Sequence, residues 1–168
     1  MYYAWMESPV GRLLLAADDL GLRHVIFSGG RELAEPRPEW RPDPKPLTET
    51  IQQLRAYFAG ELRDFDLKLA PRGPAFHQLV WRELCNIPYG ETISYGELAR
   101  RAGSPNASRA VGRANGANPI AIVIPCHRVI GSNGKLTGYG GGLPRKEFLL
   151  GLERAQTPLW RVAAISPA

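Results

Sequence analysis

Residues 94–116 read SYGELARRAGSPNASRAVGRANG, and this stretch predicts two short helices joined by a tight turn. Ser94 followed by Glu97 is a capping-box pattern, which predicts a first helix that ends at Gly103. The pair Ser104-Pro105 predicts the start of a second helix, because proline is favoured in a first helical turn. Two short helices joined in this way are the signature of a helix-turn-helix.

The second of these helices carries small side chains where a helix that reads the major groove of DNA would carry long polar ones. Ala107, Ser108, Ala110 and Gly112 are small, and Arg109 is the long cation that stands among them. This pattern is typical of close approach to a minor groove, with one inserted side chain and an extruded base. Packing of the small side chains against another helix explains it equally well, so the residues alone leave both interpretations open.

The N-terminal part of the chain predicts a mixture of strands and one helix. Apolar runs bounded by turn residues predict strands at 2–6, 13–17 and 22–27. Apolar side chains at helical spacing predict a helix over 48–59, and the alternating run 65–69 predicts an edge strand. The segment after it, rich in Pro and Gly, reads as a linker. We therefore predict two domains, residues 1–72 and 73–168.

The rest of the second domain predicts further helices and one hairpin. Apolar spacing predicts a helix that begins near Phe76 and ends before Pro88, with Cys85 inside it as a buried small hydrophobe. The run 129–136, with a Gly-Ser-Asn-Gly turn at its centre, predicts a small hairpin or wing. A last helix is expected from Arg145 to about Glu153. The whole chain is therefore expected to be α+β.

Composition limits the class of protein. The chain has 168 residues, of which 44% are hydrophobic, enough for a packed core. Two cysteines make no disulfide framework, and three scattered histidines give no zinc spacing, so we expect no metal. The N-terminus lacks the pattern of a signal peptide, and no run approaches the length of a membrane span. A reducing cytoplasm is the expected location.

Charge is distributed unevenly between the two predicted domains. Residues 1–72 contain 10 Lys and Arg against 11 Asp and Glu, a net charge of −1. Residues 73–168 contain 11 against 5, a net charge of +6. A basic domain beside a near-neutral one fits contact with a polyanion such as nucleic acid, although ordinary surface arginine would give the same balance.

The run 124–129, IPCHRV, places a thiol between a proline and a histidine. The thiolate is the reactive form of cysteine, and a neighbouring base or cation raises its population. Any covalent chemistry of this chain is therefore expected to be sulfur nucleophilic chemistry at Cys126. The motif by itself also permits a cysteine hydrolase that turns over, with His127 as its base.

These residues together resemble the O6-alkylguanine-DNA alkyltransferases, a family of direct-reversal DNA repair proteins. The resemblance spans residues 75–154 and rests on 93–99, 108–112, 118–119, 124–130, 138–142, 146–150 and Glu153. The first domain matches more loosely, at 8–11 and 57–60. The resemblance implies an N-terminal ribonuclease-H-like α/β domain and a C-terminal winged helix-turn-helix domain.

The resemblance also implies catalytic roles. Cys126 would accept the alkyl group and become a stable thioether, in a single turnover that consumes the protein. His127 would take the thiol proton through a water, and Glu153 would hold that histidine. Tyr95 would contact DNA and donate a proton to the purine at N3, and Asn118 would tie the turn before the cysteine loop. For Glu153 a solvated position, and for Tyr95 simple packing, are the structural alternatives.

Recognition of the base is implied in the same way. The backbone N–H of Gly140 would contact O6, and Tyr139 would line the pocket for the alkyl group. The carbonyls of Cys126 and Val129 would accept from the exocyclic amine and so select guanine. Arg109 would fill the space that the flipped base leaves in the stack. Arg128 is expected to bond neighbouring carbonyls, with a phosphate contact as the alternative.

The implied partner is double-stranded DNA that contains O6-alkylguanine, with O4-alkylthymine left open, bound at the minor groove with the damaged base flipped. The protein is expected to act as a monomer without cofactors, and cooperative binding along DNA is left open. Two alternatives of other classes remain at this stage. A winged-helix regulator would bind DNA without a reactive Cys126, and a cysteine hydrolase would turn over and ignore DNA.

Overall fold

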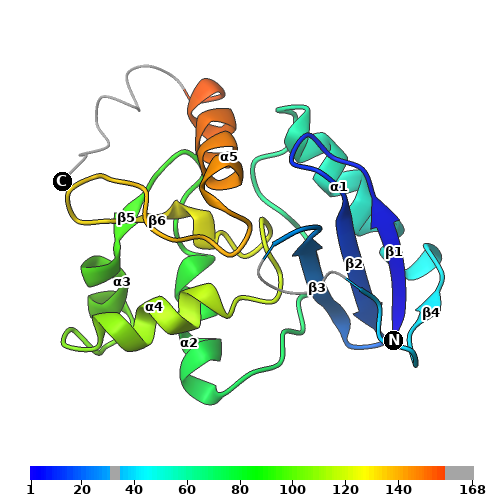
Figure 1. Ribbon diagram of the computed structural model, residues 1–168, viewed down its shortest axis with the longest axis horizontal. Helices are drawn as coiled ribbons and strands as arrows, with labels where there is room; N and C mark the ends of the chain where they lie inside the picture. Colours follow the sequence, from blue (N-terminus) through cyan, green and yellow to red (C-terminus); the bar gives the residue numbers. More distant parts are fainter. Residues whose placement is uncertain (31–34, 158–168) are drawn as a thin grey trace. The chain divides into compact units, whose positions relative to one another are not determined.

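The computed structural model describes residues 1–30 and 35–157, which pack into two compact units (Figure 1). The first unit comprises Met1–Arg72 and the short segment Pro119–Val123, and the second comprises the remaining described residues. The segment joins the first unit because Val25 donates its N–H to Pro119 O, and Ala121 donates its N–H to Val25 O. A division of the chain at residue 72 alone would place this segment in the second unit.

The first unit is built on a four-stranded sheet in the order β3-β2-β1-β4 (Figure 1). The pairs β1–β2 and β2–β3 are antiparallel, whereas β1 and β4 are parallel. The strands are β1 (Tyr2–Met6), β2 (Leu13–Asp18), β3 (Gly21–Phe27) and β4 (Arg41–Pro42). The three long strands confirm the sequence prediction. The predicted strand at 65–69 is wrong, because only Leu69 forms an isolated bridge, with Leu22.

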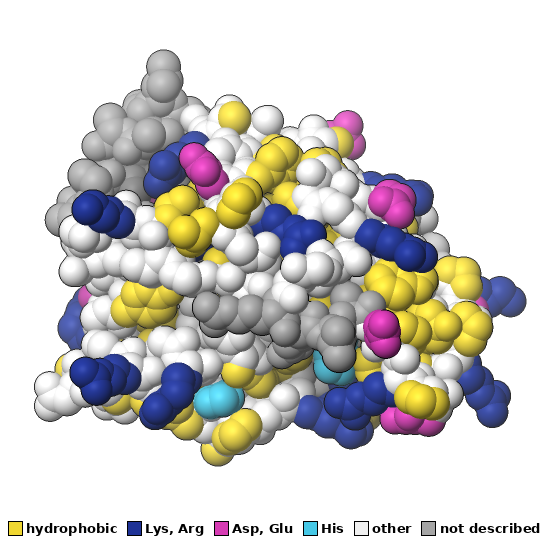
Figure 2. Space-filling view, in the orientation of Figure 1, with side chains coloured by type: hydrophobic (Ala, Val, Ile, Leu, Met, Phe, Trp, Pro, Cys, Tyr) yellow, Lys and Arg dark blue, Asp and Glu magenta, His cyan; other side chains and the backbone are white. Residues whose placement is uncertain are grey.

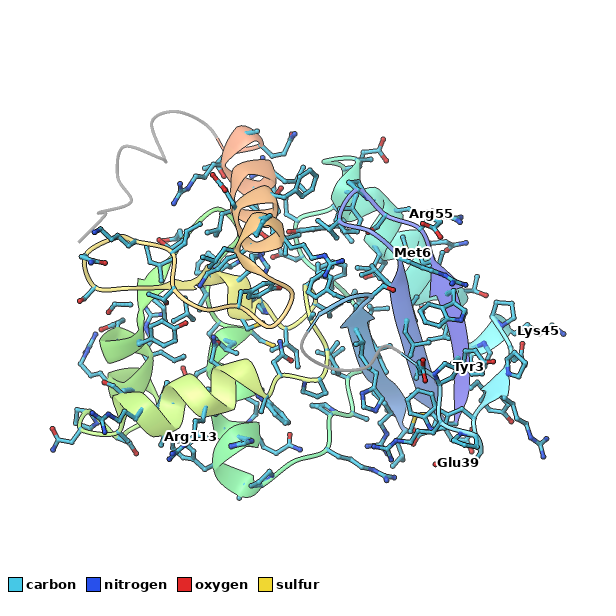
Figure 3. All side chains as sticks on the ribbon, in the orientation of Figure 1. Tyr3, Met6, Glu39, Lys45, Arg55 and Arg113 are labelled. Carbon is cyan, nitrogen blue, oxygen red and sulfur yellow. The ribbon has the colours of Figure 1, made fainter. Side chains whose placement is uncertain are left out.

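Both faces of β2 are covered, since residues 13–17 are all buried. On one face Leu14, Ala16 and Trp40 form a cluster, to which partly buried residues including Tyr3 of β1 add (Figure 3). A 3₁₀ turn, η1 (Lys45–Leu47), leads into helix α1 (Thr48–Phe58), which buries Thr50, Leu54 and Tyr57. The predicted helix over 48–59 is therefore confirmed to within one residue.

One titratable side chain beside this cluster, His24, should make stability depend on pH. His24 stacks on Trp40 with ring centroids 5.3 Å apart, and its Nδ1 is buried without a protein partner among the described residues. Burial, helped by the charges of Arg37, Arg23 and Arg72, lowers the pKa of His24 from 6.5 to about 4. The folded state therefore resists protonation between these two pH values, whereas the unfolded state accepts the proton.

We expect the free energy of unfolding to fall as the pH is lowered from 6.5 to 4, and to be insensitive to this group outside that range. The shift corresponds to at most about 3 kcal/mol, and to roughly 1–2 kcal/mol once partial solvent screening is included. The unfolding temperature should fall less between pH 7 and pH 4.5 in His24→Phe than in the wild-type protein. This variant keeps an aromatic ring on Trp40. An unchanged difference in that variant would contradict the assignment.

The second unit is mainly helical, with α2 (Ala75–Leu84), α3 (Tyr95–Arg101), α4 (Ser108–Gly116) and α5 (Leu143–Ala155) (Figure 1). Ser94 accepts from the backbone N–H of Glu97 at 3.1 Å, which confirms the predicted cap of α3. The predicted start of α4 at Ser104-Pro105 is wrong. Residues 104–107 instead close a turn through a bond from Ala107 N to Ser104 O, so the helix begins at Ser108.

Two further predictions for this unit are wrong. Val129 and Ile130 form strand β6 (Val129–Ile130), but its partner is the parallel strand β5 (Ile93–Ser94) rather than residues 135–136. A turn closed by bonds from Gly131 N to Lys135 O and from Gly134 N to Gly131 O replaces the expected hairpin. Cys85 caps the C-terminus of α2 and is exposed rather than buried. Among the described residues, no helix has the length and apolar character needed to cross a membrane.

Candidate active site and nucleic-acid interface

Cys126 begins a 3₁₀ turn, η2 (Cys126–Arg128), that leads directly into β6. Cys126 is a buried residue, 7% exposed. Pro125 has φ −81° and ψ 63°, and Cys126 donates its N–H to Ile124 O at 2.8 Å, so an inverse γ-turn precedes the thiol. Asn118 donates its side-chain amide to the same Ile124 carbonyl at 2.8 Å. The backbone before Cys126 is therefore held from two directions.

A buried histidine–carboxylate pair joins this turn to α5. His127 Nε2 is 2.7 Å from Glu153 Oε2, and the two side chains are 0% and 1% exposed. Because a carboxylate accepts, the proton of the neutral ring is on Nε2, which leaves Nδ1 as an acceptor. Nδ1 is buried and has no protein partner in the described part of the chain. The burial of Glu153 excludes the alternative that it is a solvated carboxylate at a helix end.

Arg128 completes the environment of Glu153. Its Nε donates to Glu153 Oε1 at 2.8 Å, its Nη2 donates to Oε2 at 3.1 Å, and its Nη1 donates to Ile87 O at 2.7 Å. The guanidinium also lies over the ring of Tyr89, 5.6 Å from its centroid. Arg128 is buried, so its donors serve the protein interior and not a DNA phosphate.

The ionisation of the three central groups follows from burial and from their neighbours. Burial raises the pKa of the Cys126 thiol, although hydrogen bonds from Asn118 and Tyr139 and the charge of Lys146 oppose that shift. Burial also lowers the pKa of His127 despite its carboxylate partner. Burial of Glu153 opposes its ionisation, but His127 and Arg128 outweigh it and lower the pKa of the carboxyl. The resting site therefore holds a thiol, a neutral imidazole and a carboxylate.

The loop 131–142 lies against Tyr95 at the start of α3. Thr137 donates its hydroxyl to the Tyr95 hydroxyl oxygen at 3.2 Å, which leaves the phenol proton of Tyr95 available to another acceptor. Tyr139 is buried, and a Cβ built at Gly140 would meet no atom within 4 Å, so the space beside Gly140 is open. Val129 is fully buried in β6, and its carbonyl accepts from Lys146.

The exposed side of α4 carries the residues that the sequence marked for DNA contact. The helix packs inward through Val111, Ala114 and Asn115, and Trp81 Nε1 donates to Ala114 O at 2.8 Å. The small residues and the arginine remain partly or fully exposed: Ala107, Ser108, Arg109, Ala110 and Gly112. They do not form the packed face of the helix, which disfavours the alternative that their small size serves helix packing.

Two unpaired arginines add positive charge to α4. Arg109 and Arg113 are exposed and take part in none of the ion pairs among the described residues, and Figure 3 shows Arg113 on this helix. By contrast, Arg100 and Arg101 of α3 both pair with Glu97. On the face shown in Figure 2, Lys and Arg side chains are interspersed with hydrophobic and neutral surface. The unpaired cations of α4 are free to meet phosphates.

Sequence reasoning missed three partners in this site. It did not pair Arg128 with Glu153, and it assigned no role to Lys146, which is 0% exposed, or to Asn115, whose amide is 3.4 Å from Cys126 O. A signal for Lys146 was present, because residues 146, 149, 150 and 153 share one face of α5. Two charged residues on an otherwise apolar helical face indicate buried charges with a specific task. The described residues contain no cluster of three or more His, Cys, Asp or Glu that could hold a metal ion.

Fold and site define a class of protein: a sheet-based unit precedes a helix-turn-helix unit, which holds a buried cysteine beside a histidine–carboxylate pair. Family models for the two parts of 6-O-methylguanine DNA methyltransferase match the chain, the ribonuclease-like domain at residues 1–71 and the DNA-binding domain at residues 75–155. The chain belongs to the 6-O-methylguanine DNA methyltransferase family. The predicted α+β fold, with an N-terminal ribonuclease-like domain and a C-terminal DNA-binding domain, is confirmed.

Individual relatives agree with this assignment over nearly the whole chain. A methylated-DNA–protein-cysteine methyltransferase of Methanosarcina acetivorans is 58% identical over 153 residues, which are 91% of this chain and 98% of the relative. The Mycobacterium tuberculosis protein of the same name is 52% identical over 159 residues, 94% of this chain and 95% of the relative. The crystal structure of Mycobacterium tuberculosis OGT in complex with DNA matches with a TM-score of 0.88 and 50% identity, covering 96% of this chain and 98% of that one.

Proposed function

We propose that this protein repairs DNA by direct reversal, transferring the alkyl group of O6-alkylguanine in DNA irreversibly to its own Cys126. The observation that carries the proposal is the buried His127–Glu153 pair next to Cys126, in a chain of this family. Relatives that are 58% and 52% identical over the aligned residues bear the name methylated-DNA–protein-cysteine methyltransferase. Because both cysteines are free, the thiol is available for the reaction, and we propose a reducing cytoplasm as its location.

The nucleophile is the Cys126 thiolate, which forms when the thiol proton passes to His127. His127 Nδ1 is the open acceptor of a ring whose other nitrogen donates to Glu153, so it can take the thiol proton through one intervening water. Glu153 then stabilises the imidazolium that forms, as Arg128 holds that carboxylate in place. The thiolate attacks the alkyl carbon in line, a carbon–sulfur bond forms, and the carbon–oxygen bond breaks with its electron pair on O6.

The departing guanine anion needs a proton. Tyr95 is the proposed donor at N3, and its own oxygen already accepts from Thr137, so its proton points to another acceptor. The Gly140 N–H is the proposed contact to O6, and the open space at Gly140 would admit the purine edge. The Cys126 and Val129 carbonyls are the proposed acceptors of the exocyclic amine, and Tyr139 the wall beside the alkyl group. The product thioether has no ionisable proton, so the protein acts once.

The exposed face of α4 is the proposed DNA contact. Ala107, Ser108, Ala110 and Gly112 allow the helix to approach a minor groove closely, and Arg109 would occupy the gap left by the flipped base. Extrusion of a base costs a few kcal/mol, and the inserted guanidinium offsets part of it by stacking.

The proposal is tested with duplex DNA that carries O6-methylguanine labelled on its methyl group. We expect one label per protein molecule, located on the peptide that contains Cys126 by mass spectrometry, and no second turnover when DNA is in excess. DNA binding without transfer would instead indicate a regulator, and repeated turnover a hydrolase. Either outcome from a folded, reduced sample would refute the proposal.

Arg109→Ala tests the role of this side chain in base extrusion. We expect transfer from duplex DNA to slow by about tenfold or more, since the few kcal/mol of extrusion lose their compensation. The reaction with free O6-benzylguanine, which needs no extrusion, should stay within about twofold, because Arg109 is exposed and unpaired in the described structure. Arg82→Ala, an exposed arginine on α2, is the matched control for loss of one charge. Equal losses with both substrates would count against the extrusion role.

A further inference from the structure

Lys146 of α5 is a fully buried ammonium without a carboxylate partner. Its side chain is 0% exposed, and none of the ion pairs among the described residues includes it. Burial of an unpaired charge is costly, so its donors must be well used. Nζ donates to Val129 O at 2.6 Å and to Thr137 O at 3.2 Å. The ammonium of Lys146 is therefore hydrogen-bonded to two backbone carbonyls and not to a carboxylate.

The first of these carbonyls has a proposed task in base recognition. Val129 follows η2 directly, and its carbonyl is one of the two proposed acceptors of the guanine 2-amino group. A carbonyl oxygen has two lone pairs, so a donor on one of them fixes its direction and leaves the other for a ligand. A charged donor also makes the stronger and shorter bond. Lys146 thus determines where the Val129 oxygen points.

The second carbonyl extends this control to Tyr95. Lys146 holds the backbone of Thr137, and the Thr137 hydroxyl donates to the Tyr95 hydroxyl oxygen at 3.2 Å. One ammonium on α5 therefore connects β6, the loop 131–142 and the first residue of α3. Of these elements, β6 and α3 supply proposed contacts to the 2-amino group and to N3, and the loop supplies the proposed contact to O6 of the same purine.

We propose that Lys146 is the positioning residue that makes the site selective for the guanine 2-amino group. It acts on selectivity by orienting the Val129 carbonyl, and it does not itself contact the base. Through Thr137 it also positions the Tyr95 hydroxyl, which serves N3 of either purine. The inference rests on the proposed function, because it concerns selection of the alkylated purine. A site built to bond an N–H group rejects an analogue that lacks it, provided that its acceptor is held in place.

A different role for Lys146 would be purely electrostatic. Burial lowers the pKa of Lys146, a Cys126 thiolate opposes that shift once it forms, and the lysine in turn favours the thiolate. If this attraction were the whole role, loss of Lys146 would slow transfer from every substrate by the same factor and shift the pH–rate profile of the thiol. Base selectivity would not change.

The experiment compares two substrates in one duplex sequence: O6-methylguanine and O6-methylhypoxanthine, which lacks the 2-amino group. The wild-type protein is expected to react faster with the guanine. In Lys146→Met this preference should shrink by at least about fivefold, because the guanine reaction slows more than the hypoxanthine reaction. Lys135→Met removes an exposed lysine from the loop 131–142 and should keep the wild-type preference.

Thr137→Val keeps Lys146 and its carbonyl contacts but removes the bond to Tyr95. It should therefore slow transfer from both substrates and retain most of the preference for O6-methylguanine over O6-methylhypoxanthine. If Lys146→Met does not fold, Lys146→Gln, which retains two N–H donors without charge, is measured instead, and a reduced preference is expected. An unchanged preference in the measured Lys146 variant overturns the inference, as does an equal loss with a shifted pH–rate profile. If the wild-type protein transfers no methyl group from O6-methylguanine, the proposed function itself fails.

Discussion

Cys126→Ser is expected to abolish alkyl transfer while the protein still folds and binds DNA. A serine hydroxyl is far harder to ionise than a thiol, and its harder oxygen is a poorer nucleophile toward saturated carbon, so the rate should fall by roughly 10⁴-fold or more. The exchange of sulfur for oxygen changes little volume at a side chain that is 7% exposed. Folding should therefore be nearly unchanged, and affinity for duplex DNA with O6-methylguanine should stay within a few-fold.

The second cysteine of the chain supplies a matched control. Cys85 is an exposed residue at the end of α2, and the partial burial of its sulfur raises the pKa of the thiol, while the charge of Arg128 opposes that shift without cancelling it. Cys85→Ser should retain one transferred methyl group per molecule at the wild-type rate. Label found on Cys85 in the Cys126→Ser protein, or loss of transfer in Cys85→Ser, would show that exposure and not the His127–Glu153 pair selects the acceptor.

The fold was predictable wherever a pattern is local. The cap of α3 needs only Ser94 and Glu97, and the three long strands need only apolar runs between turns. The errors in strand pairing arose where the partner of a segment is remote, whereas the start of α4 was misplaced by a local turn at residues 104–107. Val129 and Ile130 pair with β5, which lies more than 30 residues earlier in the chain, and no feature of 129–136 indicates this choice. The run 65–69 alternates like a strand but finds only one bridging contact.

The sequence indicated side chains that the structure brings together at the candidate site, but not the residues that support them. Cys126 and His127 stand out because they are adjacent, whereas the role of Glu153 came from the family resemblance. The partners of Arg128 and Lys146 were missed because they lie far away in the sequence. Arg128 bonds Ile87 and Glu153, and Lys146 reaches back to β6. Sequence spacing showed that Lys146 and Glu153 share a helical face, but only coordinates show which atoms they bond.

Glu153→Gln is expected to cost both stability and activity. Glu153 accepts from His127 and twice from Arg128 in a buried network, so neutralising it leaves a buried guanidinium without its counter-ion. Breaking a buried pair in this way costs about 3–5 kcal/mol of unfolding free energy. Transfer should slow by roughly 10³-fold, because the amide no longer stabilises the imidazolium of His127 and can hold the wrong tautomer. Denaturant unfolding and single-turnover transfer measure the two effects.

The pH dependence makes this prediction specific to the carboxylate. The network lowers the pKa of Glu153 below its ordinary value of 4.5, so its stabilisation is complete above that value and declines as the pH falls below it. The stability difference between wild-type and Glu153→Gln should therefore be largest near neutrality and narrow in acid. Glu147→Gln, at an exposed carboxylate of the same helix, should change stability by less than about 0.5 kcal/mol. If Glu153→Gln lowers the free energy of unfolding by an equally small amount, or by an amount that does not change with pH, the charge of Glu153 does not stabilise the positions of Arg128 and His127.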